Sequence, residues 1–101
     1  MRIISIKKLR DFWEQPIYAD SEQPLKSWFH EVNADNADWK TPSDLKLQYS
    51  SASILKNSRV VFNIYGNKYR LVVSINYAYR VVYIRFIGTH KQYDAIDVEA
   101  I

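Results

Sequence analysis

A histidine, a lysine and a tyrosine lie within four residues near the end of the chain, at His90, Lys91 and Tyr93. Such side chains suit one reaction that needs no metal, the cleavage of RNA by its own 2′-hydroxyl. That reaction needs a base for the hydroxyl proton, cations for the charge on the phosphorane, and an acid for the 5′-oxygen. DNA lacks the 2′-hydroxyl and is spared. The structural alternative is a C-terminal turn in which Tyr93 packs and His90 caps.

Basic residues are distributed unevenly along the chain, although the net charge of +3 is modest. Residues 1–44 carry six Lys or Arg and eight Asp or Glu, whereas residues 45–93 carry eight Lys or Arg and no acid. The last eight residues carry three acids and no base. An acid-free stretch of this length predicts a surface that binds a polyanion. A solvated sheet face with a chance shortage of acids is an equally good explanation.

Several catalytic classes lack the side chains that they need. The two histidines are His30 and His90, and His30 lies in a predicted helix, so no histidine pair has the spacing of a zinc site. The chain has no cysteine, and its two glycines, Gly66 and Gly88, cannot form a phosphate-cradling loop. Because residues 45–93 contain no carboxylate, neither a glycosidase pair nor a two-metal nuclease site fits this stretch. We expect no metal and no cofactor.

The length of 101 residues predicts one domain over residues 1–101. Hydrophobic residues make up 48% and charged residues 25%, which is typical of a folded soluble protein. The sequence has no apolar run of about 18 residues, and its start does not resemble a signal peptide. With the absence of cysteine, these features favour a cytoplasmic protein that has no contact with membranes.

The first part of the chain has the periodicity of helices. A first helix follows Ser5, whose hydroxyl is placed to cap it. A second helix carries an apolar stripe at positions i, i+3, i+4 and i+7. This stripe consists of Leu25, Trp28, Phe29 and Val32. Residues 33–40 predict a loop in which Trp39 tucks back, and Thr41 and Pro42 predict the start of a short third helix.

The second part of the chain predicts an antiparallel sheet. Three segments are rich in β-branched and aromatic side chains. They span residues 60–65, 69–77 and 80–87. Gly66 and Asn67 are a two-residue hairpin signal, and a turn at Asn57 and Ser58 would add an edge strand over residues 54–56. The expected fold is therefore α+β, with N-terminal helices packed on one face of an antiparallel β-meander.

The apolar residues fix the expected register of these hairpins. The turn at residues 66–67 pairs Asn63 with Arg70. In the second hairpin the expected pairs are Leu71–Phe86, Val72–Arg85 and Ser74–Tyr83. The predicted core face holds Phe62, Ile64, Tyr69, Leu71, Val73, Ile75, Val82, Ile84 and Phe86. The opposite face is cationic and holds Lys56, Arg59, Asn63, Lys68, Arg70, Ser74, Tyr83 and Arg85.

Two runs of sequence resemble the HigB family of toxins. They are VFNIYGNKYR over residues 61–70 and YIRFIGTHKQYD over residues 83–94. Residues 41–44 leading to 52–53, and the opening residues 1–4, also resemble this family. The resemblance covers nearly the whole chain and implies a RelE-like fold.

The resemblance also implies an activity and partners. Members of the HigB family are mRNA interferases that typically act on messages in translating ribosomes. A helix-turn-helix antitoxin, HigA, neutralises them, and operator DNA is bound through the toxin–antitoxin complex. We therefore expect an endoribonuclease that inhibits translation and growth, with messenger RNA, the ribosome and a HigA-like antitoxin as partners.

Site residues follow from the same resemblance. We expect His90 to act as general acid or base, Arg70 to stabilise the phosphorane, and Lys91 to hold phosphate. Tyr93 is expected to transfer a proton or to stack on the base. The resemblance adds Asn63, Lys68 and Arg85 as RNA-binding residues, and the predicted cationic face adds Lys56 and Arg59.

Two other functions remain open at the level of sequence. ParE-like relatives inhibit DNA gyrase and cleave nothing, and a non-catalytic RNA-binding module would show salt-sensitive binding without cleavage. His90 and the basic cluster discriminate against the gyrase inhibitor, which does not need them. The three tryptophans, Trp13, Trp28 and Trp39, either fill the space between helices and sheet or leave one ring to contact an antitoxin.

Overall fold

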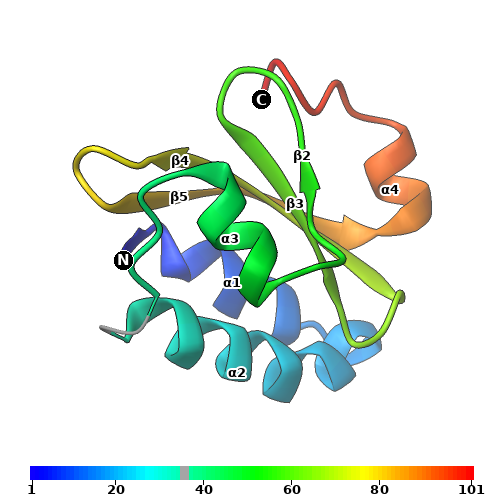
Figure 1. Ribbon diagram of the computed structural model, residues 1–101. Coiled ribbons are helices and arrows are strands. Elements are labelled where there is room, and N and C mark those ends of the chain that lie inside the picture. The colour runs from blue at the N-terminus through cyan, green and yellow to red at the C-terminus, as the bar shows by residue number, and fades with distance from the viewer. Residues whose placement is uncertain (35–36) are drawn as a thin grey trace.

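The computed structural model describes residues 1–34 and 37–101 and arranges them in two layers. The N-terminal helices pack on one face of a five-stranded sheet whose strand order is β1-β5-β4-β3-β2 (Figure 1), so the predicted α+β class is confirmed. The helices are α1 (Ile6–Trp13), the 3-10 helix η1 (Pro16–Ser21), α2 (Glu22–Asn33), α3 (Pro42–Gln48) and α4 (His90–Asp94). The strands are β1 (Arg2–Ile4), β2 (Ser53–Ile54), β3 (Arg59–Ile64), β4 (Tyr69–Asn76) and β5 (Val81–Thr89).

The three N-terminal α-helices lie where the sequence predicts them. Helix α3 starts at the expected cap, because the Thr41 hydroxyl accepts from the backbone of Asp44 and the Asp44 carboxylate accepts from the backbone of Thr41. Ser5 does not cap α1 through its side chain and instead has a left-handed φ of 74°. The predicted loop over residues 33–40 includes two residues outside the described part of the chain. No helix in the described part is long and apolar enough to cross a membrane.

Strand β1 is the element that the sequence pattern does not predict. Its three residues pair in parallel with β5, with Ile3 opposite Val82, so the sheet is mixed and the antiparallel meander is only part of it. A run of three residues is too short to show the period of a strand. The parallel pair is possible because most of the chain, including α1 to α3, connects the two strands.

Strands β3 and β4 form the predicted hairpin around residues 66–67. Asn63 lies opposite Arg70, as expected. Ser74 also lies opposite Tyr83 in the next pair of strands, so the register is correct near the middle of the sheet.

The register is wrong closer to the end of β5. Leu71 lies opposite Ile87 and Val72 lies opposite Phe86, whereas the sequence predicts Leu71 opposite Phe86 and Val72 opposite Arg85. The cause is a β-bulge that gives β5 one extra residue, Arg85, at this point. The bulge reverses the inward and outward alternation of every later residue of the strand.

The core lies between the helices and the face of the sheet that they cover, which we call the inner face. Apart from Phe86, the predicted core residues are buried there. Trp28 and Trp39 belong to this core, and Trp13 packs against it while partly exposed. The bulge turns Phe86 to the opposite side of the sheet, the outer face, beside Val72. The inner-face residues of the sheet are Val60, Phe62, Ile64, Tyr69, Leu71, Val73, Ile75, Val82 and Ile84.

Helix α4 begins directly after β5 because Thr89 and Gln92 form a capping box. The Thr89 hydroxyl accepts from the Gln92 backbone at 3.2 Å, and Gln92 Oε1 accepts from the Thr89 backbone at 2.8 Å. Gln92 Nε2 also donates to the Tyr18 hydroxyl of η1 at 3.0 Å. Gly88 permits this close approach, since a Cβ there would lie 2.6 Å from both Phe86 Cζ and Gln92 Oε1.

The β3–β4 turn is tied to η1 through one carboxylate. Asp20 accepts from the ammonium group of Lys68 and from the hydroxyl of Tyr69. The hydrogen bond from Lys68, followed by that from Tyr69, lowers the pKa of Asp20. Lys68 is therefore engaged by the helical layer and does not join the cationic outer face on which the sequence places it.

Asp20→Asn tests this link. Because the folded-state pKa of Asp20 is lowered, its carboxylate stabilises the fold above the unfolded-state pKa, and this contribution disappears as the pH falls through the folded-state pKa. We expect the melting temperature of the wild type to fall further than that of Asp20→Asn between about pH 7 and about pH 3. Asp11→Asn is the control, because it removes only an exposed helical pair with Lys7. An equal fall in wild type and Asp20→Asn would contradict the link.

Gly88→Ala tests how α4 is seated. The added methyl group would push Gln92 out of the capping box and press on the Phe86 ring, so we expect a loss of about 1–3 kcal/mol in unfolding free energy, as for other overpacked sites. Amide chemical shifts of α4 should move in the same variant. Gly66→Ala is the matched control: it meets no neighbour within 4 Å, and its left-handed φ of 63° strains only the turn. Unmoved α4 signals in Gly88→Ala would refute this account.

Candidate functional site

Arg70, His90, Asn67 and Tyr93 meet at the end of the sheet where β5 passes into α4. Arg70 Nε lies 3.4 Å from His90 Nε2, and His90 Nε2 lies 3.1 Å from Asn67 Oδ1. The guanidinium carbon of Arg70 lies 4.9 Å from the centroid of the Tyr93 ring. Arg70 thus contacts two of the other three residues that the sequence assigns to catalysis, His90 and Tyr93.

Three elements position this cluster. Arg70 projects from β4, Asn67 from the turn before it, and His90 and Tyr93 from α4. His90 and Tyr93 are three residues apart, which places them on one side of the helix. Gly88 is the cross-strand partner of Arg70, so no side chain of β5 separates the guanidinium from α4.

The Nε2 atom of His90 lies between a donor and an acceptor. When Nε2 carries no proton, it can accept the hydrogen bond from Arg70 Nε, and when it is protonated it can donate to Asn67 Oδ1. The nitrogen thus has one neighbour that donates and one that accepts. A ring nitrogen with both kinds of neighbour has contacts suited to a general acid or base.

Arg70 is a partly buried cation without a carboxylate. Its contacts are His90 and the face of the Tyr93 ring, and no ion pair within residues 1–34 and 37–101 includes it. A guanidinium favours oxyanions that match its fork of N–H donors, and phosphate is one of these. The cluster is therefore a candidate anion site beside a group that exchanges protons.

Two further predicted residues lie beside the cluster. Lys91 is exposed on α4, next to His90. Asn63 lies opposite Arg70 on β3 and is partly buried, and its Nδ2 donates to the Ser51 carbonyl at 3.4 Å. Both are close enough in the chain or the sheet to contact a ligand that spans the cluster.

The other predicted RNA-binding residues do not join the cluster. Lys68 pairs with Asp20, as described above, and Arg85 lies at the bulge with its guanidinium 5.5 Å from the centroid of the Tyr83 ring. Arg59 is at the far end of β3, and Lys56 is exposed before the turn that precedes β3. The predicted cationic face is therefore divided into separate parts.

Asn67 is a site residue that the sequence analysis misses. It is treated there only as a turn former, because a Gly-Asn pair is a hairpin signal. Its side chain nevertheless reaches His90, 23 residues later in the chain. The available signal was geometric: the same turn that pairs Asn63 with Arg70 brings Asn67 to the end of the sheet where β5 exits.

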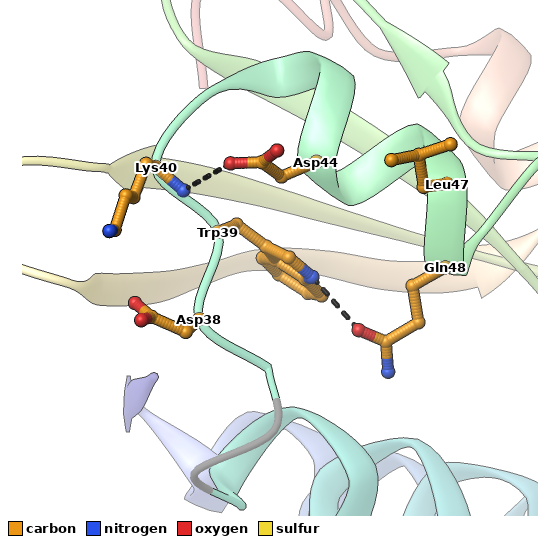
Figure 2. Close-up of a pocket in the computed structure, with 6 residues that line it drawn as sticks. All are labelled: Asp38, Trp39, Lys40, Asp44, Leu47 and Gln48. Atoms are coloured by element: carbon orange, nitrogen blue, oxygen red, sulfur yellow. Dashed lines mark hydrogen bonds between the residues drawn. The ribbon is translucent and has the colours of Figure 1, made fainter.

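A separate hollow lies beside α3 and contains none of the predicted site residues. Figure 2 shows its lining, in which Trp39 Nε1 donates to Gln48 Oε1 at 2.9 Å and Asp44 Oδ2 accepts from the Lys40 backbone at 2.9 Å. These polar groups fasten the segment before α3 to the helix. Leu47, also in the lining, is 87% exposed. The hollow has the contacts of a structural junction and not those of a reaction site.

Comparison with known proteins agrees with the two motifs at this site. A family model described as HigB_toxin, the RelE-like toxic component of a toxin–antitoxin system, matches residues 21–96. The mRNA interferase toxin HigB of Escherichia coli (strain K12) is 36% identical over 58 residues, which are 55% of this chain and 56% of that protein. The mRNA interferases HigB of Escherichia coli O157:H7 and Shigella flexneri match to the same extent, so the chain spans about half the length of these curated relatives. With three quarters of its residues covered by the family model, this chain belongs to the HigB family of RelE-like toxins.

Proposed function

We propose that this chain is an endoribonuclease that cuts messenger RNA and so inhibits translation and growth. Membership of the toxin family and the mRNA interferase activity named for its relatives support this class of reaction. The observation that carries the proposal is the contact between Arg70 Nε and His90 Nε2 beside the Tyr93 ring. A cation without a counter-ion and a proton-exchanging group at one point are what attack by a 2′-hydroxyl requires.

In the proposed reaction the 2′-oxygen attacks the adjacent phosphorus, and the bond from phosphorus to the 5′-oxygen breaks. Arg70 stabilises the charge that develops on the non-bridging phosphate oxygens, and Lys91 holds the phosphate from the exposed side of α4. His90 Nε2 takes the 2′-hydroxyl proton or protonates the leaving 5′-oxygen, and Tyr93 serves the other transfer or stacks on the base. The products are a 2′,3′-cyclic phosphate and a 5′-hydroxyl.

We extend the proposal to the partners of the protein. A helix-turn-helix antitoxin of the HigA kind neutralises it, in keeping with the description of the family as the toxic component of a pair. Messages in translating ribosomes are its substrates, which places its action in the cytoplasm. Operator DNA is contacted through the toxin–antitoxin complex.

His90→Ala and Arg70→Ala test the site. Removing a general acid or base typically lowers a rate by about 10²- to 10⁴-fold, so we expect each variant to relieve growth arrest in expressing cells. His30→Ala is the matched control, because His30 is exposed on α2 and lies outside the cluster. Unchanged toxicity in a soluble, folded His90→Ala protein would remove His90 from the mechanism.

Primer extension on messages from the same cells separates the possible activities. Discrete new 5′ ends that vanish in His90→Ala support cleavage of the message. Double-strand DNA breaks with intact messages would replace the proposal with inhibition of gyrase. RNA binding without new ends, even when ribosomes are supplied, would replace it with a non-catalytic module.

We also propose that the reaction needs no metal ion. The scheme requires one base, one acid and a cation, all of which the cluster can supply. No group of three potential metal ligands occurs within the described ranges 1–34 and 37–101. We expect cleavage of a purified RNA or ribosome-bound message to continue at an unchanged rate after the toxin is treated with EDTA and returned to buffer with the magnesium that ribosomes need. A loss of activity that zinc or manganese restores would contradict metal independence.

A further inference from the structure

The outer face of the sheet has three rows of side chains that run across β3, β4 and β5. The first row, at the cluster, consists of Asn63, Arg70 and Gly88. The middle row is apolar and consists of Val61, Val72 and Phe86. The far row is polar and consists of Arg59, Ser74 and Tyr83. Arg70 of the first row and Ser74 of the far row are four positions apart in β4, which is about 13 Å at the rise of a strand.

The last seven residues of the chain reach this outer face. The Asn57 side chain donates to the Glu99 carbonyl at 3.1 Å, and the Arg59 guanidinium donates to the Ile101 carbonyl. In Figure 1 the chain passes from α4 back toward the loop between β2 and β3, beside which it ends. Val61 and Val72 are only 2% and 0% exposed although they face away from the helical core, which agrees with a segment that covers the middle row.

Arg59 is bound to this segment through a backbone oxygen. Its guanidinium donates to the Asn57 carbonyl and to the backbone oxygen of Ile101, and no Asp or Glu side chain in the described part of the chain pairs with it. Its Nε is buried and has no hydrogen-bond acceptor. An arginine with a buried donor that lacks an acceptor would gain a hydrogen bond from a phosphate oxygen.

The composition of residues 95–101 suits a segment that occupies the place of an anionic ligand. Residues 95–101 carry two acids, Asp97 and Glu99, and no base, and they lie against the half of the chain that carries no acid. Neither acid forms an ion pair through its side chain within the described residues, and the hydrogen bonds from Asn57 and Arg59 reach backbone oxygens of the segment. Attachment of this kind can be reversed at small cost when a ligand supplies stronger contacts to the same donors.

We propose that the outer face is the path of the RNA strand beyond the scissile phosphate, and that residues 95–101 occupy this path in the free protein. This inference rests on the proposed ribonuclease function. A second phosphate of the RNA binds the far row at Arg59, and a base covers the apolar middle row when the segment leaves. RNA is favoured over a protein partner, because the far row offers a cation that no Asp or Glu side chain of the described residues neutralises, together with two hydroxyl groups and the Asn57 amide.

A reversible link between the segment and the sheet tests this proposal. The chain has no cysteine, so Asn57→Cys with Glu99→Cys gives two unique thiols at the observed contact. A short bismaleimide that contains a disulfide joins them, and a reductant cleaves the joint. Affinity is measured by fluorescence anisotropy with a labelled single-stranded RNA that is 2′-O-methylated and so cannot be cleaved. We expect the linked protein to bind at least about tenfold more weakly than the reductant-treated one, since it loses phosphate contacts.

The control carries the same linker on the other layer. Lys7→Cys with Asp11→Cys joins two exposed positions of α1, and its RNA affinity should not change on linking. Equal affinity of the Asn57–Glu99 protein before and after reduction would overturn the proposed role of residues 95–101, while cleavage activity would leave the ribonuclease proposal standing. Failure of both forms to bind RNA would overturn the proposed RNA path, whereas the ribonuclease proposal is decided separately by primer extension.

Discussion

The guanidinium of Arg70 lies against the imidazole of His90 where most proteins would place a carboxylate. Such a pair is stable only if other groups satisfy it, because two side chains that can both carry positive charge repel one another. The Tyr93 ring offers its negative face to the cation, and Asn67 offers an oxygen to the imidazole. All acids of the chain lie in residues 1–44 and 94–101. The stretch between them, which contains Arg70, therefore supplies no carboxylate to neutralise it. The site therefore keeps a place for an anion that comes from outside the chain.

The rest of the structure keeps these groups at contact distance. The hairpin register places Arg70 next to the turn that carries Asn67, and the capping box at Thr89 starts α4 so that His90 is its first residue. Gly88 removes the one side chain that would stand between them. The helices of the inner layer bury the inner face that holds the strands in register.

The sequence predicts the features that repeat with a clear period and misses those that depend on a single residue. The apolar stripe around Trp28 predicts α2, and the alternation from Phe62 to Ile75 predicts both faces of β3 and β4. The bulge at Arg85 is missed because every residue around it is a good strand former, so an unbroken alternation and a shifted one look alike. Strand β1 is too short to show a period. The contact between residues 95–101 and Arg59 is missed because it joins segments 42 residues apart, which no local pattern connects.

For the site, the sequence predicts the contacts between residues that are near in the chain and misses one between distant residues. Arg70, His90 and Tyr93 are brought together because the end of β5 lies beside the start of β4, which the hairpin order implies. Lys68 was expected with them and instead pairs with Asp20, a residue 48 positions earlier that no local pattern connects to the turn.

All four groups of the cluster nevertheless come from residues 67–93. Contacts that span only 20 and 23 residues close small loops, and small loops close early in folding. During synthesis the cluster can therefore assemble once α4, which carries His90 and Tyr93, has followed the second hairpin out of the ribosome.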